Sequence, residues 1–250
     1  MQIDDSVFSF KHFEVRHDRC AMKVGTDGVL LGAWTCADGA AILDIGTGTG
    51  ILALMMAQKC GAVIDAIDIN HHAYLQAAEN FKRSAWSERL TAFHSSLQEY
   101  EKIAGKKYDL IISNPPFFID AMKAGSDARN EARHINESLT FEELIDGVKL
   151  LLAEGGRFCV ILPVKEGSLF ITMCEKKGLF CNHLVHVKTK TTKEAKRLLI
   201  EFGFVRKNML HDELVIHNDD GSYGEKYVKL TEDFYTHLPE RGLSTNCELR

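Results

Sequence analysis

From about residue 41 the chain alternates short apolar runs, rich in β-branched residues, with longer stretches whose apolar residues recur at helical spacing. This alternation is typical of a parallel sheet covered by helices. It predicts strands at residues 41–45, 63–68, 90–94, 108–113 and 157–162. It predicts helices at 51–59, 71–83, 139–153 and 166–177, the third closed by Gly155 and Gly156 and the fourth by Gly178.

The flanks of this pattern complete the expected fold. Two β-rich runs at 181–188 and 197–206 predict an antiparallel hairpin on the edge of the sheet, which brings the strands to seven. Residues 1–40 precede the alternation and predict an N-terminal cap of the same domain, with a short helix at 28–34. We therefore expect an α/β, Rossmann-like, mostly parallel domain at 41–238, followed by a loose tail at 239–250.

The composition indicates an ordinary globular chain of 250 residues, 45% hydrophobic and 26% charged. No apolar run reaches the roughly 18 residues of a membrane span, and the amino terminus has acids where a signal peptide needs positive charge. We expect a cytoplasmic protein. The seven cysteines include no CxxC pair and the eleven histidines no HExxH, so we predict neither a disulfide framework nor a metal site.

The net charge of −5 is unevenly distributed. Between residues 176 and 207 nine basic residues are opposed by only two acidic ones, and a smaller basic group lies at Lys11, Arg16, Arg19 and Lys23. Two interpretations stay open for each group: a solvated charged face, or a surface that contacts the phosphates of a nucleic acid.

A glycine-rich turn, DIGTGTG at residues 44–50, joins the first predicted strand to the first helix. Glycines let the backbone approach a ligand closely, and the helix N-terminus supplies free amides. Ile51 stands where a dinucleotide-binding loop needs its third glycine, and no Lys-Ser or Lys-Thr follows as in a P-loop. The remaining ligand is a nucleoside without phosphate, and S-adenosylmethionine fits this description.

Two acids end the strands beside this loop. Asp44 ends the first strand, where a carboxylate can organise the turn and face the ammonium group of the ligand. Asp68 ends the second strand, where a carboxylate can accept both ribose hydroxyls. Capping of the following helix is the alternative role for Asp68.

The segment Ser113-Asn114-Pro115-Pro116-Phe117 ends the fourth predicted strand. Its prolines fix φ and remove two amide donors, so the segment is rigid and rich in acceptors. The side-chain oxygen of Asn114 and the carbonyl of Pro115 can each accept one N–H of an exocyclic amino group, which aims the nitrogen at a methyl donor without a strong base. Phe117 can stack on the base, and Phe118 can wall the pocket. The alternative is a proline-stiffened loop.

Together these motifs resemble the seven-stranded amino methyltransferases that act on adenine, guanine or glutamine amides. The run FEVRHDRCAMKVGTDGVLLGAW at residues 13–34 narrows the resemblance to the bacterial tRNA1(Val) (adenine(37)-N6)-methyltransferases, and the likeness covers about residues 10–234. The resemblance implies an enzyme that moves a methyl group from S-adenosylmethionine to the N6 of an adenine in tRNA. We expect it to act as a monomer.

The resemblance also assigns roles to single residues. The implied cofactor-binding residues are Lys23, Thr26, Asp27, Asp44, Gly46, Gly48, Gly50, Asp68, Ser96 and Asn114, and the candidate catalytic residues are Asn114, Pro115, Pro116 and Phe117. Ser96 is a departure, because relatives often place an acid there that contacts the adenine amino group of the cofactor. The candidate RNA contacts are Phe118, Arg129, Arg133, Lys188, Lys190, Lys193, Lys196 and Arg197.

Three other functions stay open. A ribosomal RNA guanine N2-methyltransferase uses the same chemistry, since an Asn-Pro-Pro-Phe motif serves either amine. A protein glutamine methyltransferase more often has Tyr at the position of Phe117. A non-catalytic module that binds cofactor or RNA is a different class, and the intact motif at residues 114–117 argues against it.

Overall fold

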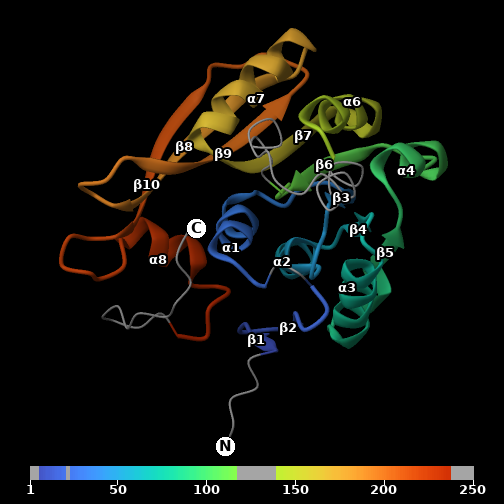
Figure 1. Cartoon of the computed structure of the whole chain (residues 1–250), viewed down its shortest axis with the longest axis horizontal. Coiled ribbons are helices and arrows are strands. Elements are labelled where there is room, and N and C mark those ends of the chain that lie inside the picture. The colour runs from blue at the N-terminus through green and yellow to red at the C-terminus, as the bar shows by residue number, and fades with distance from the viewer. Residues whose placement is uncertain (1–5, 21–22, 117–138, 238–250) are drawn as a thin grey trace, which may run out of the picture.

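The computed structural model describes residues 6–20, 23–116 and 139–237, and the centre of this part is an eight-stranded sheet. Its strands lie in the order β10-β8-β9-β7-β6-β3-β4-β5 (Figure 1). Their bounds are β3 Ala41–Ile45, β4 Val63–Asp68, β5 Leu90–His94, β6 Tyr108–Ser113, β7 Leu152–Pro163, β8 Phe180–Lys190, β9 Ala195–Gly203 and β10 Leu210–His217. Neighbours pair in parallel except around β9, which is antiparallel to β7 and to β8.

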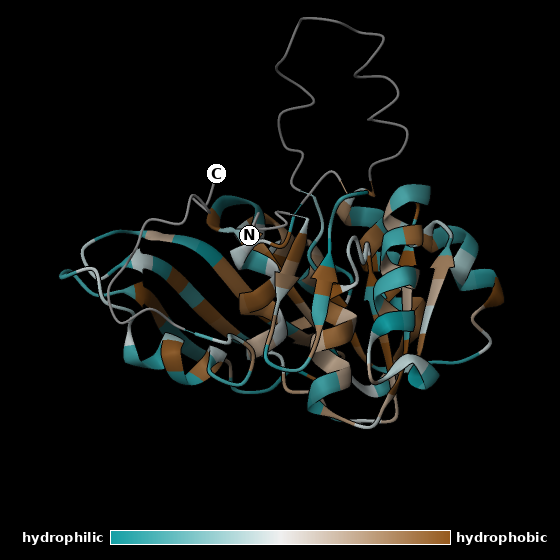
Figure 2. Cartoon of the chain, turned by 90° about the horizontal axis from the view of Figure 1, so that it is seen from below, coloured by the Kyte–Doolittle hydropathy of each residue, from teal (hydrophilic) through white to brown (hydrophobic). Residues whose placement is uncertain are grey.

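Helices cover both faces of the sheet. One face carries α1 (Thr26–Trp34), α2 (Ile51–Lys59), α3 (His71–Arg83) and α8 (Glu225–Thr231), and the other carries α4 (Leu97–Ile103), α6 (Phe141–Leu151) and α7 (Val164–Lys176). Each layer buries its own apolar core, and the helix sides turned away from the sheet are mostly hydrophilic (Figure 2). Within the described ranges, no helix has both the length and the apolar character needed to cross a membrane.

The hydrophobic pattern predicted the central elements correctly. The strands β3, β4, β5 and β6 and the helices α2 and α3 have the predicted bounds, and α7 lies within two residues of its predicted ends. The central strands are easy to recognise because helices cover them on both sides, so that Ile42 and Leu43 are both fully buried. The fold class is confirmed. Helix α4 was not predicted; it follows a Ser96–Glu99 capping box.

Strand β10 corrects the predicted edge of the sheet. The hairpin of β8 and β9 is confirmed, but β10 pairs in parallel with β8 and takes the edge position, so the described sheet has eight strands rather than seven. The first half of β10, Leu210–Glu213, is exposed and carries His211, Asp212 and Glu213. Without buried alternation this half gives no strand pattern in the sequence.

The role predicted for Gly155 and Gly156 is wrong. Helix α6 ends at Leu151, and both glycines lie inside β7. A Cβ on Gly156 would lie 2.9 Å from the carbonyl oxygen of Tyr108 in β6. This glycine therefore permits two strand backbones to approach each other, instead of ending a helix.

The N-terminal segment forms a small hairpin outside the main sheet. Strands β1 (Val7–Ser9) and β2 (Glu14–Arg16) pair antiparallel, and Phe10, Phe13 and Val15 join the apolar core on the face that carries α1, α2, α3 and α8. Helix α1 begins at Thr26 rather than at Gly28. The hairpin also contacts the C-terminal segment, where the Lys11 N–H donates to the Phe234 carbonyl at 2.8 Å and Phe10 forms a bridge with Tyr235.

Strand direction decides which edge of the sheet carries the candidate site. The parallel strands β3 to β7 all end at one edge. Because β9 is antiparallel to β7 and β8, the turn between β8 and β9 at residues 191–194 also lies at this edge, and Pro163 pairs with Arg197 there. We call it the carboxyl edge.

Candidate active site

The glycine loop between β3 and α2 turns on three glycines with positive φ: Gly46 at 70°, Gly48 at 57° and Gly50 at 84°. Gly50 packs against α3, and a Cβ there would lie 2.6 Å from the ring of Phe81. Only glycine fits both this φ and this space. The Gly46 N–H donates to the Ile67 carbonyl at 2.9 Å, which holds the loop against the end of β4.

The other two loop glycines face open space. Apart from the glycines and their chain neighbours, no atom of the described residues lies within 4 Å of the place that a Cβ would take on Gly46 or Gly48. Bare backbone at a strand end, followed by a helix N-terminus, lets a ligand reach peptide amides directly. The loop therefore leaves its backbone open to a polar ligand, as binding of S-adenosylmethionine requires.

Asp44 is fully buried beneath this loop. Its Oδ2 accepts hydrogen bonds from Thr47 Oγ1 at 2.6 Å and from the Ala53 N–H at 3.3 Å. Its Oδ1 has no hydrogen-bond partner among the described residues. Burial raises the pKa of Asp44 to about 7, against the lowering effect of those two hydrogen bonds. A cationic group would satisfy the unpaired oxygen and favour the carboxylate.

Asp68 contacts the same loop from the end of β4. Its Oδ2 accepts from the Gly48 N–H and its Oδ1 from the Asn70 N–H, both at 2.8 Å. Burial raises its pKa. The alternative role as a helix cap is wrong, because Asn70 is the residue that caps α3, accepting from the His72 and Ala73 amides. Each oxygen of Asp68 keeps a lone pair for a further donor.

The Asn-Pro-Pro segment begins directly beside the glycine loop. Ile45 and Ser113, the last residues of β3 and β6, are register partners, and Ser113 Oγ donates to the Ile45 carbonyl at 2.8 Å. Asn114 is half-buried, Pro115 is buried and Pro116 is exposed. The candidate residues Phe117, Phe118, Arg129 and Arg133 lie outside the described residues.

The start of α1 lies against the start of α2. A Cβ on Gly28 would lie 3.4 Å from Ile51 Cγ2, the first side chain of α2, so the neighbouring Thr26 and Asp27 lie close to the glycine loop. Lys23 is exposed. The Asp27 Oδ2 accepts from Arg197 Nε at 2.8 Å, and its Oδ1 is buried without a partner among the described residues.

Ser96 has a structural role in this molecule. It is the N-cap of α4: its hydroxyl accepts from the Glu99 N–H at 3.2 Å and lies 2.9 Å from the Glu99 carboxylate. The hydroxyl is thus already engaged in the capping box. A backbone group is the remaining candidate for a contact with the adenine of the cofactor.

The candidate RNA contacts in the basic stretch at residues 176–207 differ in their exposure. Lys190, Lys193 and Lys196 are exposed in or beside the β8–β9 turn at the carboxyl edge. Lys188 pairs with Glu213 of β10 at 2.6 Å, and Arg197 is buried in its pair with Asp27. Exposure therefore favours the first three lysines as phosphate contacts.

Two amides on α3 were missed by the sequence analysis. Gln76 and Asn80 lie on the buried face of α3 that packs against the glycine loop and β2. Their sequence signal is a pair of polar residues at a spacing of four within an otherwise apolar stripe, between Ala73, Ala77 and Phe81.

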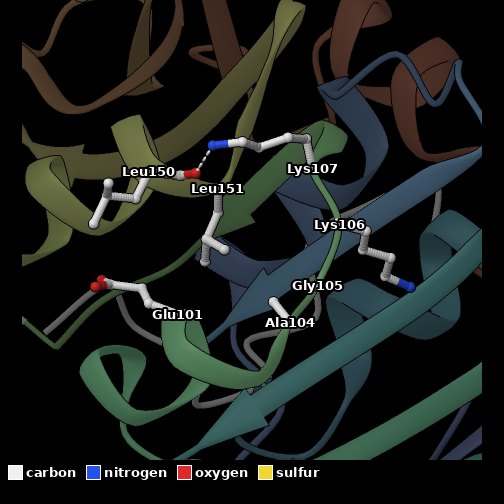
Figure 3. Close-up of a pocket in the computed structure, with 7 residues that line it drawn as sticks. All are labelled: Glu101, Ala104, Gly105, Lys106, Lys107, Leu150 and Leu151. Carbon is white, nitrogen blue, oxygen red and sulfur yellow. Dashed lines mark hydrogen bonds between the residues drawn. The ribbon is translucent and has the colours of Figure 1, made fainter.

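A pocket of about 280 Å³ lies at the opposite edge of the sheet, between the ends of α4 and α6 and the start of β6 (Figure 3). Its two cations are already engaged: Lys106 Nζ contacts Asp65 at 2.7 Å, and Lys107 Nζ donates to the Leu150 carbonyl. This pocket is separate from the site at the carboxyl edge.

Comparison with known proteins identifies the relatives of this chain. The methyltransferase small domain matches residues 23–165. A tRNA1(Val) (adenine(37)-N6)-methyltransferase of Flavobacterium psychrophilum is 46% identical over 92% of this chain and 99% of its own length. Proteins of the same name from Bacteroides fragilis and Photorhabdus laumondii are 45% and 42% identical over 91% of this chain, and over 97% and 94% of their own lengths.

Solved structures share the fold at low sequence identity. A crystal structure described as a predicted O-methyltransferase from Agrobacterium tumefaciens has a TM-score of 0.66 at 16% identity, covering 83% of this chain and 96% of that one. The glycopeptide N-methyltransferase MtfA, solved with S-adenosyl-L-methionine, has a TM-score of 0.52 at 11% identity, covering 72% and 95%.

The sheet order, with a glycine loop after β3 and an acid at the end of β4, defines a Rossmann-like methyltransferase. The chain belongs to the family of tRNA1(Val) (adenine(37)-N6)-methyltransferases. This confirms the resemblance that residues 13–34 and 113–117 indicated.

Proposed function

We propose that this protein transfers the methyl group of S-adenosylmethionine to the exocyclic N6 of adenine in tRNA, at position 37 beside the anticodon of a valine tRNA. The names of the relatives support the substrate. The observation that carries the chemistry is the Ser113–Ile45 hydrogen bond of 2.8 Å, because it fixes the ends of β6 and β3 side by side. Asn114 and Pro115 therefore begin next to the glycine loop.

The cofactor side of the site is held by backbone and carboxylates. S-adenosylmethionine supplies an electrophilic methyl group on a sulfonium when it is bound. The open backbone at Gly46 and Gly48 accommodates its methionine portion, and the unpaired Oδ1 of Asp44 accepts from the ammonium. Asp68 accepts from the ribose hydroxyls, with its geometry fixed by the two amides that it already binds.

The substrate side positions the amino group. The Asn114 side-chain oxygen and the Pro115 carbonyl each accept one N–H of the adenine N6, which draws the nitrogen lone pair out of the ring and toward the methyl group. Bound S-adenosylmethionine would supply the methyl group: its sulfur–carbon bond would be exchanged for a nitrogen–carbon bond at N6, and one N–H proton would pass to water. Positioning and hydrogen bonding carry this step, so no strong general base is required.

The RNA backbone is proposed to bind at the carboxyl edge. Lys190, Lys193 and Lys196 are exposed there, and Lys165, which follows the end of β7, adds a fourth exposed cation. A chain of net charge −5 attracts a polyanion only through such a local concentration. Arg197 is left out of this surface because its side chain is buried.

The test is methylation of tRNA that lacks its native modifications. The purified protein and S-adenosylmethionine are incubated with this RNA, which is then digested for identification of its nucleosides by mass spectrometry. N6-methyladenosine mapped to position 37 of valine tRNA is the expected product. N2-methylguanosine, or product in ribosomal RNA alone, would keep the chemistry and overturn the substrate. No methylated RNA, despite cofactor binding, would reject the proposal in favour of a protein substrate or a non-catalytic module.

A further inference from the structure

Two side-chain amides lie on the buried face of α3. Gln76 is 0% exposed and Asn80 is 1% exposed, in a stripe that otherwise consists of Ala73, Ala77 and Phe81. Burying an amide is unfavourable unless its polar atoms are hydrogen-bonded. Asn80 makes three hydrogen bonds and Gln76 one, with its Nε2 unpaired among the described residues, and these bonds show which segments the face holds.

Asn80 joins two segments that are distant in sequence. Its Oδ1 accepts from the Arg16 N–H at 3.0 Å, and its Nδ2 donates to the Arg16 carbonyl at 2.9 Å and to the Thr49 carbonyl at 2.8 Å. Arg16 ends β2, and Thr49 belongs to the glycine loop. One carboxamide thus connects the N-terminal hairpin to the loop, and the connection needs an acceptor and two donors at once.

Gln76, one helical turn before Asn80, extends the contact between α3 and the N-terminal segment. Its Oε1 accepts from the Arg19 N–H at 3.0 Å, and the Arg19 guanidinium pairs with Glu79 at 3.0 Å. Residues 16–20 therefore run along α3 on the way to α1. They also pass close to Asp68, the acid proposed to bind the ribose. Burial is the larger cause and the negative charge of Asp68 the next that raise the pKa of the Cys20 thiol, to about 11.

The glycine loop is pressed against the same face. Gly50 lies so close to α3 that a Cβ would meet both the Phe81 ring and Ala77 Cβ, at 2.6 and 3.3 Å. The loop and the segment 16–20 are therefore held by the same face of α3, and Asp68 joins the loop through the Gly48 N–H. A shift of the loop or of the segment breaks hydrogen bonds of Asn80.

We propose that Asn80 is a positioning residue that couples segment 16–20 to the glycine loop, so that docking of this segment and binding of the cofactor stabilise each other. The coupling is reciprocal, as any coupling between two binding equilibria is. This inference rests on the proposed function in one respect, namely that the glycine loop holds S-adenosylmethionine. Asn80 contacts neither the cofactor nor the base in this scheme and acts only through Thr49 and Arg16.

Asn80→Asp tests the coupling with little change of shape. The carboxylate keeps an acceptor for the Arg16 N–H but turns an oxygen toward two carbonyls. Asn182→Asp is the matched control, because Asn182 is also a buried amide, 7% exposed, that donates to the Val205 carbonyl at 3.0 Å and accepts from the Lys207 N–H at 2.9 Å, far from the loop. We expect the Kd for S-adenosylmethionine, by calorimetry, to rise about tenfold or more in the first variant and less than about twofold in the second. An unchanged Kd in Asn80→Asp, or an equal rise in both, would overturn the proposal.

Hydrogen exchange separates this inference from the proposed function. Without any cofactor, the Arg16, Gly48 and Gly50 amides should exchange faster in Asn80→Asp and at the wild-type rate in Asn182→Asp. In the wild-type protein, native-state exchange in low urea should show the Arg16 and Gly50 amides opening as one unit. Independent opening would reject the coupling even if Asn80→Asp did not fold. A wild-type protein that bound no S-adenosylmethionine would instead reject the proposed function, while the exchange data would still decide the coupling.

Discussion

Arg197 Nε lies 2.8 Å from Asp27 Oδ2, and the two side chains are only 10% and 15% exposed. The pair joins the start of β9 to the first turn of α1, elements separated by most of the chain. A guanidinium in this position stabilises the carboxylate of Asp27 and fixes its direction. Arg197, which the basic stretch suggested as an RNA phosphate contact, is thus buried in an ion pair that holds the start of α1 to β9.

The first prediction concerns the stability that this pair provides. Arg197→Ala leaves a largely buried carboxylate without its cation, so we expect the free energy of unfolding in urea to fall by roughly 2–4 kcal/mol. Lys188→Ala removes the more exposed pair with Glu213 and should cost less than about 1 kcal/mol. Equal losses in the two variants would show that the burial of Arg197 has no energetic consequence.

The second prediction concerns Asn114. Asn114→Ala removes one of the two proposed acceptors for the adenine amino group, so methylation of tRNA should fall at least about a hundredfold, as loss of a transition-state hydrogen bond does elsewhere. Binding of S-adenosylmethionine should persist, because the glycine loop and Asp68 are unchanged. Both quantities are measured on one preparation, by single-turnover kinetics and calorimetry. Near-normal turnover would reject the role of the motif.

The third prediction concerns Asp68. Asp68→Ala should weaken cofactor binding by roughly 1.5–3 kcal/mol, the usual loss for charged hydrogen bonds. Asp109→Ala is the control, because Asp109 also accepts two backbone amides, from Ala40 at 2.7 Å and Ala41 at 3.1 Å, at the opposite edge of the sheet. Calorimetry should show that the Asp109→Ala variant binds S-adenosylmethionine with unchanged affinity. A comparable loss in both variants would indicate general loosening of the sheet rather than a ribose contact.

The fourth prediction follows from the pKa of Asp44, which burial raises to about 7. If its carboxylate accepts from the cofactor ammonium, affinity should increase as the pH rises from 6 to 8, by at most about tenfold per pH unit below the pKa. The stability of the protein without cofactor should depend on pH in the opposite sense. Because burial favours the neutral acid in the folded state, Asp44 contributes its full stabilisation below pH 3.8, and this contribution is lost as the pH rises through about 7. In the Asp44→Asn variant both dependences should flatten; an unchanged pH profile would exclude Asp44 as their source.

The fifth prediction concerns RNA binding. Phosphate contacts give a log–log salt dependence of about −0.7 per contact for single strands. Replacing Lys190, Lys193 and Lys196 with Gln should reduce the magnitude of the slope by about 2 if all three contact phosphate. Lys106→Gln, at the opposite edge, should leave the slope unchanged. Filter binding at several salt concentrations measures the slope for both variants. A triple variant with the wild-type slope would show that the RNA binds elsewhere on the protein.

The sequence predicted the centre of this fold and the position of the glycine loop because the information there is local. Ile42 and Leu43 in β3 and Leu110–Ile112 in β6 are buried on both faces of the sheet, so consecutive apolar residues mark these two strands. Positive φ at Gly46, Gly48 and Gly50 is also a local property, visible as glycine in a turn. The proximity of the two motifs followed from the rule that parallel strands end at one edge.

The parts of the structure that the sequence did not predict depend on pairs of residues that are distant in sequence. Nothing near Arg197 shows that its partner is Asp27, and nothing near Asn80 shows that it binds Arg16 and Thr49. The first half of strand β10 gives no pattern because it pairs with β8 through the backbone and carries exposed charged side chains. Ser96 was interpreted as a cofactor contact although Glu99, three residues on, already indicated a capping box.

The bridge between Phe10 and Tyr235 has a consequence for the order in which the protein matures. The ribosome makes the N-terminal hairpin first, yet the residues that close over its outer side, Phe234 and Tyr235, are among the last parts of the described chain to emerge. The outer side of the hairpin therefore stays uncovered until these residues have been made. By the coupling proposed for Asn80, a nascent chain is expected to reach its full affinity for S-adenosylmethionine only after Tyr235 has packed on Phe10.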